Sequence, residues 1–283
     1  MTSVPLVLSW LVFAHLLADF VLQTESIALG KFGDGTPAWR ALGAHVAVVG
    51  LVNVPVVLVF GLPGLGFLVV TAVTHLLIDR GKIVLTKRGD TPAGSMSDDS
   101  PEGPALDRSW TPFPALLFVL DQLAHLGVLV VAWALLLSGA VPLTIWTDTV
   151  NGLLGTADRS AFHAAVLGLV VISDLAIVNV RAGSLFVATL VRAPRSKGAE
   201  GSAGVPSPAR IGATIGVLER LIVSALVLAN ASTAIGFVIA AKTLARFKQL
   251  DDREFAEYYL LGTLASTAVA ILSSLLALQA LPH

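Results

Sequence analysis

The chain has 283 residues, of which 55% are hydrophobic and only 13% are charged. Soluble domains carry about 25% charged residues, so these charges are too few to cover a water-soluble globule of this length. The formal net charge of −1 provides no electrostatic footprint for nucleic acid. The chain has no cysteine, which excludes disulfides and cysteine-ligated metal sites. The composition therefore predicts a polytopic membrane protein.

About 20 apolar residues cross the hydrocarbon core of a bilayer as a helix. Apolar runs of this kind predict an all-α transmembrane bundle of about eight helices, with seven as the alternative. The sixth and seventh runs are nearly continuous, and residues 230–232 are the best place for a turn between them. The runs are Pro5–Gln23, Ala41–Phe60, Leu62–Asp79, Phe113–Leu137, Phe162–Val180, Ile211–Ala229, Thr233–Phe247 and Phe255–Leu281.

The basic residues predict the orientation, because Lys and Arg gather in cytoplasmic loops. With the N-terminus outside, Arg159 alone among the 18 Lys and Arg residues lies on the outer side. Residues 89–112 and 194–210 are rich in Gly, Pro, Ser and charge, and are predicted to be flexible cytoplasmic segments. They divide the chain into 1–88 (helices one to three), 113–193 (helices four and five) and 211–283 (helices six to eight).

Histidine and aspartate recur at helical spacing inside the predicted spans, in the cytoplasmic half of the helices. An ionisable group at the centre of a span costs roughly 2.5 kcal/mol or more, so such groups call for an explanation. Spacing of i,i+4 places two side chains on one helix face. The pairs are His15 with Asp19, His75 with Asp79 and Asp121 with His125, and His45 lies in the second helix.

Imidazole and carboxylate are the ligands of Zn, Mn or Fe in a site without thiolates. The sequence therefore predicts a divalent metal site whose ligands are His15, His45, His75 and His125. Asp19, Asp79 and Asp121 are predicted to be further ligands, orienting groups or a general base. The alternative is that these side chains only hydrogen-bond between helices. No H-E-x-x-H motif is present, so the pattern specifies no reaction.

A second group of charged residues lies in the last third of the chain. Its functional interpretation is a pocket for a lipid phosphate or small anionic substrate beside the histidines. The alternative is charge pairing within the bundle, with Arg246 reaching toward the membrane surface. The residues are Glu219, Lys242, Arg246 and Glu257.

Several of these motifs resemble a family of bacterial integral membrane proteins known only as a domain of unknown function. The first segments that carry the resemblance are HLLADFVLQ (15–23), His45, HLLIDRGK (75–82) and DQLAH (121–125). The later ones are LERL (218–221), AAKTLARF (240–247) and EYYLLGTL (257–264). The resemblance implies a multi-pass helical protein of the bacterial inner (plasma) membrane and no established activity.

The leading hypothesis is a membrane-embedded, metal-dependent hydrolase that faces the cytoplasm and acts on a lipophilic or phosphorylated substrate. One alternative is a transporter of a cation or small anion, against which the scarcity of polar residues in the outer halves of the helices argues. The other is a non-catalytic partner protein. The lipid bilayer is the expected surrounding, and the sequence indicates no particular oligomeric state.

Overall fold

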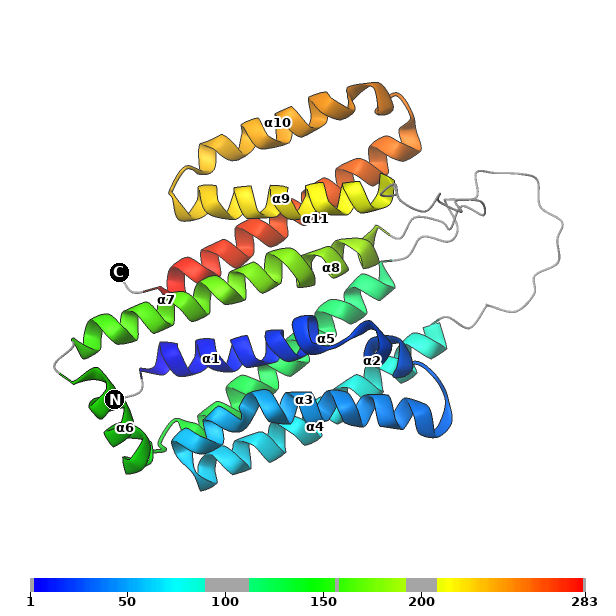
Figure 1. The fold of residues 1–283 in the computed structure, drawn as a ribbon. Coiled ribbons are helices and arrows are strands. Elements are labelled where there is room, and N and C mark those ends of the chain that lie inside the picture. Colours follow the sequence, from blue (N-terminus) through cyan, green and yellow to red (C-terminus); the bar gives the residue numbers. More distant parts are fainter. Residues whose placement is uncertain (1–2, 90–111, 156–157, 192–207, 282–283) are drawn as a thin grey trace. The chain divides into compact units, whose positions relative to one another are not determined.

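The computed structural model describes residues 3–89, 112–155, 158–191 and 208–281. Every regular element in these ranges is a helix, which confirms the predicted all-α class (Figure 1). Seven helices among the described residues are long and apolar enough to cross a membrane. The two predicted flexible segments, 89–112 and 194–210, lie almost wholly outside the described residues.

The helices of spanning length follow the predicted apolar runs, and three of them contain a π-helical turn. These long helices are α1 (Val4–Leu16) continued by η1 (Leu17–Leu22), α3 (Gly35–Phe60), α4 (Leu62–Gly89), α5 (Phe113–Ala132) continued by η2 (Trp133–Leu137), α7 (Arg159–Ile177) continued by η3 (Val178–Ala182) and α8 (Gly183–Leu190), α9 (Pro208–Leu228), and α11 (Arg253–Ala280). The π-helical turns are η1, η2 and η3.

The number of spanning helices, eight or seven, depends on whether α10 (Ile235–Arg246) crosses the membrane. A turn is present where it was predicted, since Asn230 has a φ of 56° and η4 (Ser232–Ala234) precedes α10. With 12 residues, α10 is about 18 Å long, which is less than the roughly 30 Å of a hydrocarbon core. It returns the chain alongside α9 (Figure 1) and leads through η5 (Phe247–Gln249) to α11.

Three helices extend well beyond their predicted apolar runs on the side predicted to be cytoplasmic, and one of them, α7 continued by η3 and α8, ends at Leu190 and not at Val180. The helix α3 begins at Gly35, before the run that starts at Ala41, and α4 continues ten residues past Asp79 to Gly89. Hydropathy marks only the part of a helix that lies in hydrocarbon, whereas the backbone can remain helical in the headgroup region. The Lys87 Nζ donates to Asp34 Oδ1 (2.7 Å), and this bond holds the pKa of the exposed Asp34 carboxyl below its usual value.

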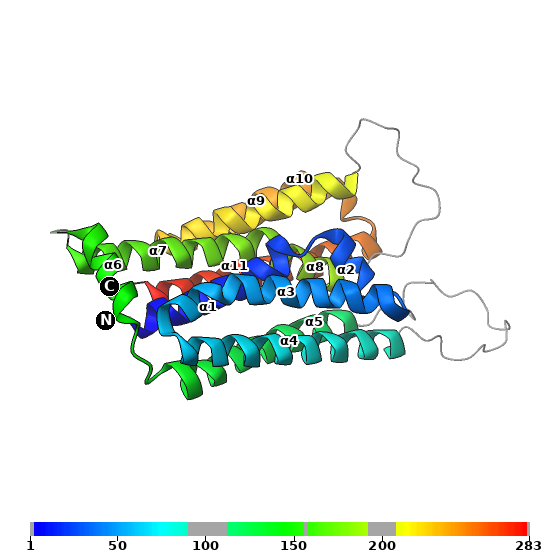
Figure 2. The same cartoon turned by 60° about the horizontal axis from the view of Figure 1, so that its bottom comes forward.

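The chain forms two compact units, residues 1–91 with 119–177 and 279–283, and residues 92–118 with 178–278. In the first unit α1, α3, α4, α5 and α7 lie side by side with alternating direction (Figures 1 and 2). Two short helices, α2 (Glu25–Gly30) and α6 (Thr144–Leu154), were not predicted and lie at opposite ends of this bundle (Figure 2). They are shorter than a span, so a search for long apolar runs passes over them.

An apolar core fills the interior of the first unit near the end at which α1 begins. It is built from Leu11, Val56, Phe60, Phe67 and Leu129, all of them buried. The short connection between α3 and α4 depends on glycine. Gly61 has a φ of 61°, and a Cβ at Gly64 would collide with the backbone of Val56 and Val57. These close contacts bring α3 and α4 together and thereby set the distance between their polar faces.

The second unit is held together by an arginine. Arg220 of α9 is buried and donates from Nε to the Asn179 carbonyl (2.6 Å), from Nη1 to Ser266 Oγ (3.0 Å) and from Nη2 to Ser184 Oγ (2.5 Å). Asn179 lies in η3, and a π-helical turn releases carbonyl groups from the regular α-helical pattern. The guanidinium therefore joins η3, α8, α9 and α11 through donors that would be costly to leave unpaired in a membrane.

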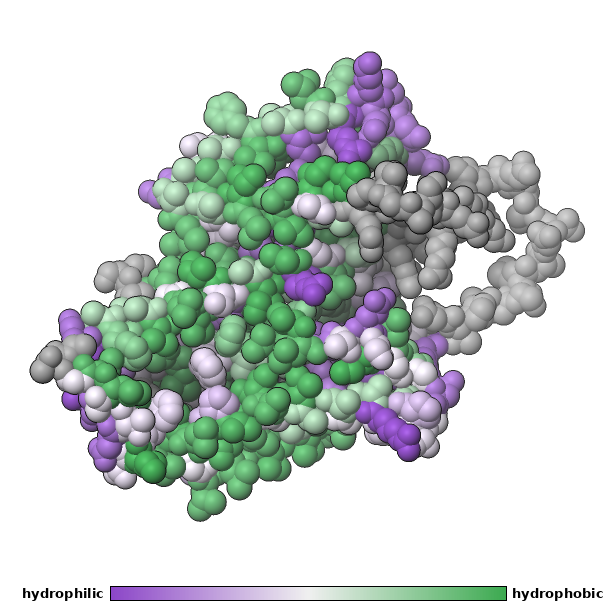
Figure 3. All heavy atoms as spheres, viewed as in Figure 1, coloured by the Kyte–Doolittle hydropathy of each residue, from purple (hydrophilic) through white to green (hydrophobic). Residues whose placement is uncertain are grey.

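The outer faces of the helices are apolar. Long side chains such as Leu51, Leu77, Leu123, Leu169 and Leu276 are more than half exposed. Figure 3 shows hydrophobic residues over much of the visible surface, with hydrophilic residues mainly near helix ends. Helices that expose their apolar side chains along their length suit a bilayer better than water.

Candidate functional site

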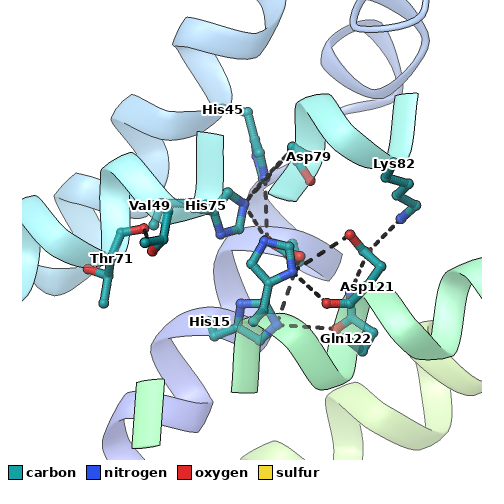
Figure 4. A network of polar contacts seen from close by, with 12 residues as sticks. His15, His45, Val49, Thr71, His75, Asp79, Lys82, Asp121 and Gln122 are labelled. Atoms are coloured by element: carbon teal, nitrogen blue, oxygen red, sulfur yellow. Dashed lines mark hydrogen bonds and ion pairs between the residues drawn. The ribbon is translucent and has the colours of Figure 1, made fainter. Parts of the chain in front are cut away.

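The four histidines and three aspartates singled out in the sequence lie together in the first unit (Figure 4). They come from five segments, because neighbouring helices run in opposite directions and place their polar turns at one level. Each of the seven side chains is no more than 8% exposed. The contributing segments are α1 (His15), η1 (Asp19), α3 (His45), α4 (His75 and Asp79) and α5 (Asp121 and His125). We call this group the His/Asp centre.

Four ligand atoms converge at one position in the His/Asp centre. The Nε2 atoms of His45 and His75 are 2.9 Å apart, and Asp19 Oδ1 lies 3.4 Å from each of them. Asp79 Oδ2 lies 3.7 Å from His45 Nε2 and 3.9 Å from His75 Nε2. Ligand atoms bound about 2.0–2.1 Å from one tetrahedral ion stand about 3.3–3.4 Å from one another. The spacing of Asp19 Oδ1 from the two imidazole nitrogens is therefore that of ligands to a single metal ion, and Asp79 Oδ2 lies slightly farther from both nitrogens.

The π-helical turn η1 carries Asp19 into this position. A π-helical turn inserts a residue into an α-helix and rotates the following side chains, and such turns are frequent at functional sites. Asp19 Oδ1 is buried and has no hydrogen-bond partner among the described residues. A buried carboxylate oxygen without a hydrogen bond is costly, and a cation at this position would remove that cost.

His125 and Asp121 flank this position. The Asp121 carbonyl accepts a hydrogen bond from His125 Nδ1 (2.9 Å), which leaves His125 Nε2 with a free lone pair. This is the tautomer that a metal ligand requires. His125 Nε2 and Asp121 Oδ1 are both buried without a hydrogen-bond partner in the described part of the chain. His15 Nε2 lies 3.2 Å from Gln122 Oε1 and 3.9 Å from Asp19 Oδ2.

Two lysines pair with the aspartates. Lys31, which follows α2, is buried and donates to Asp79 Oδ2 (2.6 Å), and Lys82 donates to Asp121 Oδ2 (2.7 Å). Lys31 was not among the predicted site residues, because in the sequence it is one of many positive charges expected on the cytoplasmic side. Three carboxylates and two ammonium groups leave one negative charge when the imidazoles are neutral, so the centre as a whole favours an additional cation.

Two cavities adjoin the centre on the side predicted to face outward. The smaller, of about 20 Å³, touches His15, His75 and His125 and has room for a single water molecule. The larger is an apolar groove of about 370 Å³ between α4 and α5, lined by Val70, Thr74, Gly127, Val128, Val131, Ala132, Leu135 and Leu136. Thr74 and Val128 line both cavities, so the groove and the small cavity beside the histidines are neighbours.

The second predicted group lies in the other compact unit. Lys242 Nζ donates to Glu219 Oε2 (2.6 Å) and lies 5.4 Å from the centroid of the Tyr259 ring. Arg246 donates to Gln249 Oε1 (2.8 Å), and Glu257 accepts from Arg253 (2.9 Å). The four predicted residues thus take part in separate local pairs.

One comparison with known proteins assigns the first half of the chain to a family. A family model described as "Protein of unknown function (DUF3307)" matches residues 7–154. This match confirms the resemblance noted in the sequence, and it includes all seven residues of the His/Asp centre. It does not reach the later motifs at 218–264. No curated protein and no solved structure matches the chain.

Proposed function

We propose that this chain, which belongs to the DUF3307 family of proteins of unknown function, is a metal-dependent hydrolase of the bacterial inner membrane. Its substrate is lipophilic or phosphorylated and enters from the membrane or the cytoplasm. The observation that carries the proposal is the approach of two carboxylate oxygens, Asp19 Oδ1 and Asp79 Oδ2, to within 3.4–3.9 Å of the Nε2 atoms of His45 and His75, which are themselves 2.9 Å apart. Simple interhelical hydrogen bonding needs no such convergence of four ligand atoms.

A divalent ion at this position supports hydrolysis by lowering the pKa of a bound water molecule and polarising the bond to be cleaved. The water oxygen bonds to the acyl carbon or phosphorus, the bond to the leaving oxygen breaks, and the leaving alcohol takes up a proton. One of the three aspartates would accept the proton of the attacking water. A divalent ion also changes the charge of the centre from one negative to one positive, which favours a substrate with an anionic group.

The groove between α4 and α5 supports a lipophilic substrate. Its lining is almost entirely apolar and includes Val70, Val131 and Leu135. An alkyl chain in the groove would point away from the predicted cytoplasmic side, while its polar end would reach the histidines through the space beside Thr74 and Val128. This is the orientation of a lipid in the cytoplasmic leaflet.

The hydrolase proposal predicts metal-dependent cleavage that favours long alkyl chains. The purified chain, loaded with Mn²⁺ or Zn²⁺ in detergent, is expected to cleave nitrophenyl carboxylate or alkyl phosphate esters, and a chelator should abolish the activity. Gly127→Leu is expected to lower kcat/KM for long-chain probes about tenfold and to leave short-chain probes unchanged. Excluding two methylene groups of the substrate from an apolar site removes about 1.6 kcal/mol of favourable binding free energy. A Cβ at Gly127 meets no atom within 4 Å, so the leucine would fill the groove without a clash of its Cβ.

Gly43→Leu is the matched control for the groove variant. Gly43 is an exposed helical glycine of α3 outside the groove, and a Cβ there also meets nothing within 4 Å. Both variants should fold, and only Gly127→Leu should discriminate between chain lengths. Activity that is unchanged by chelator, or a metal-loaded protein that cleaves none of the probes, would contradict the proposal.

The orientation can be tested by labelling, because the chain has no native cysteine. Ser26 in α2 and Asp148 in α6 are exposed and lie at opposite ends of the first unit (Figure 2). With the N-terminus outside, an impermeant maleimide added to spheroplasts should label Asp148→Cys and should reach Ser26→Cys only after lysis. Labelling of Ser26→Cys from outside would reverse the orientation and place the His/Asp centre in the outer half of the helices.

A further inference from the structure

We infer that the His/Asp centre holds two metal ions bridged by Asp79, and that its substrate is a phosphate ester. This inference rests on the proposed function and deepens it. The seven histidine and aspartate side chains exceed the four ligands that a tetrahedral ion takes. Among the described residues, three sets of three have possible ligand atoms within 4.8 Å of one another, and two of these sets share Asp79. One of the two is His45, His75 and Asp79, and the other is Asp79, Asp121 and His125.

The first ion would lie beside the Nε2 atoms of His45 and His75, which Asp19 Oδ1 approaches to 3.4 Å and Asp79 Oδ2 to 3.7–3.9 Å. Asp79 Oδ2 is the oxygen that faces the two histidines, and it also accepts from Lys31. The side chain of His45 is fully buried, so this ion would be enclosed by protein on the side of α3.

The second ion lies among Asp79, Asp121 and His125. Two atoms in this set, Asp121 Oδ1 and His125 Nε2, are buried and lack a hydrogen-bond partner among the described residues. The first ion does not need either of them. The other polar atoms of these two side chains are already engaged, since Lys82 holds Asp121 Oδ2 and the Asp121 carbonyl holds His125 Nδ1. The unpartnered lone pairs are therefore those that a second cation would use.

Two ions and two lysines define the class of substrate. Metal ions about 3.5–4 Å apart stabilise both the attacking and the leaving oxygen of an in-line displacement at phosphorus. Two divalent ions, two ammonium groups, three carboxylates and one hydroxide give a net charge of two positive. A phosphate monoester dianion neutralises that charge, whereas an uncharged carboxylate ester leaves it buried in the membrane. Lys31 and Lys82, which donate to Asp79 and Asp121, would lie beside the two ions and add positive charge for the phosphate.

The experiment is a metal titration of the purified full-length chain with Mn²⁺, followed by elemental analysis and electron paramagnetic resonance. The parent protein is expected to bind two ions per chain and to show an exchange-coupled spectrum. Asp121→Asn, which keeps the shape of the side chain, and His125→Ala should each bind one ion with the six-line signal of isolated Mn²⁺. His163→Ala is the control, because His163 in α7 is outside the sets of possible ligands, and it should behave as the parent.

A second titration tests the substrate class. Inorganic phosphate and a short-chain phosphatidic acid should each raise the melting temperature of the Mn²⁺-loaded parent, and Asp121→Asn should reduce both shifts. A larger shift with the lipid indicates a lipid phosphate, and equal shifts indicate a soluble one. One ion per parent chain with a six-line spectrum would overturn the two-metal inference and leave the hydrolase proposal standing. A parent chain that binds no Mn²⁺ and no Zn²⁺ would overturn both.

Discussion

Replacing His75 by alanine is expected to remove bound metal and to lower the melting temperature of the metal-loaded protein. His75 Nε2 lies 2.9 Å from His45 Nε2 and 3.4 Å from Asp19 Oδ1, so it belongs to the most closely spaced ligands. A ligand at one hundred times its Kd stabilises the folded state by about 2.7 kcal/mol, and the variant should lose this contribution. The lost interhelical hydrogen bonds should lower the free energy of unfolding by about 1–2 kcal/mol more.

The measurement is elemental analysis combined with melting curves, with and without chelator, for the parent, His75→Ala and His163→Ala. Added Zn²⁺, Mn²⁺ or Fe²⁺ should stabilise the parent and His163→Ala but not His75→Ala. If the centre were only interhelical packing, His75→Ala would lose the smaller hydrogen-bond contribution and no curve would respond to metal. A parent protein that contains no metal and is indifferent to chelator would leave the transporter or partner hypothesis in its place.

Arg220→Met is expected to destabilise the second unit by about 2–4 kcal/mol. The guanidinium makes three hydrogen bonds to neutral acceptors on three other helical segments. Hydrogen bonds to charged groups contribute about 1.5–3 kcal/mol each in soluble proteins, and helix contacts in membranes contribute about 0.6–1.7 kcal/mol. Methionine restores the volume of the arginine stem but leaves the Asn179 carbonyl, Ser184 and Ser266 without their donor.

Arg253→Met is the matched control, because Arg253 pairs with Glu257 on the surface and its side chain is 90% exposed. Exposed pairs contribute about 0–1 kcal/mol. Unfolding in increasing sodium dodecyl sulfate, followed by circular dichroism, should show an earlier transition for Arg220→Met and an unchanged one for Arg253→Met. Equal transitions for the two variants would mean that Arg220 does not hold the unit together. Metal content should be unchanged in Arg220→Met, since all seven side chains proposed as ligands lie in the first unit.

The spanning helices could be predicted because apolar length is a local property of the chain. Each long apolar run corresponds to a helix, and the turn near Asn230 lies where polar residues interrupt the apolar pattern. The extensions of α3 and α4 were not predicted, because a hydropathy pattern does not detect the part of a helix that lies outside the hydrocarbon core. The short helices α2 and α6 were missed for the same reason, because neither has the length of a span.

The residues of the His/Asp centre could also be predicted from the sequence. Spacing of i,i+4 places His15 with Asp19 and His75 with Asp79 on single helix faces, and alternating helix direction sets their common depth. Lys31 was overlooked because it comes from a loop, where a positive charge is expected in any membrane protein. Only the path of the chain through α2 brings its ammonium group to Asp79.

The sequence by itself determined the helical class, the spans and the seven polar side chains, since these follow from hydropathy and helical periodicity along a single chain. The tertiary structure alone decided which of those side chains meet. The rotation of each helix, the π-helical turn at Asp19 and the close approach of α3 and α4 at Gly64 bring carboxylate oxygens of Asp19 and Asp79 within 3.9 Å of the Nε2 atoms of His45 and His75. Such distances depend on packing between segments that are up to about a hundred residues apart, and no local pattern encodes them.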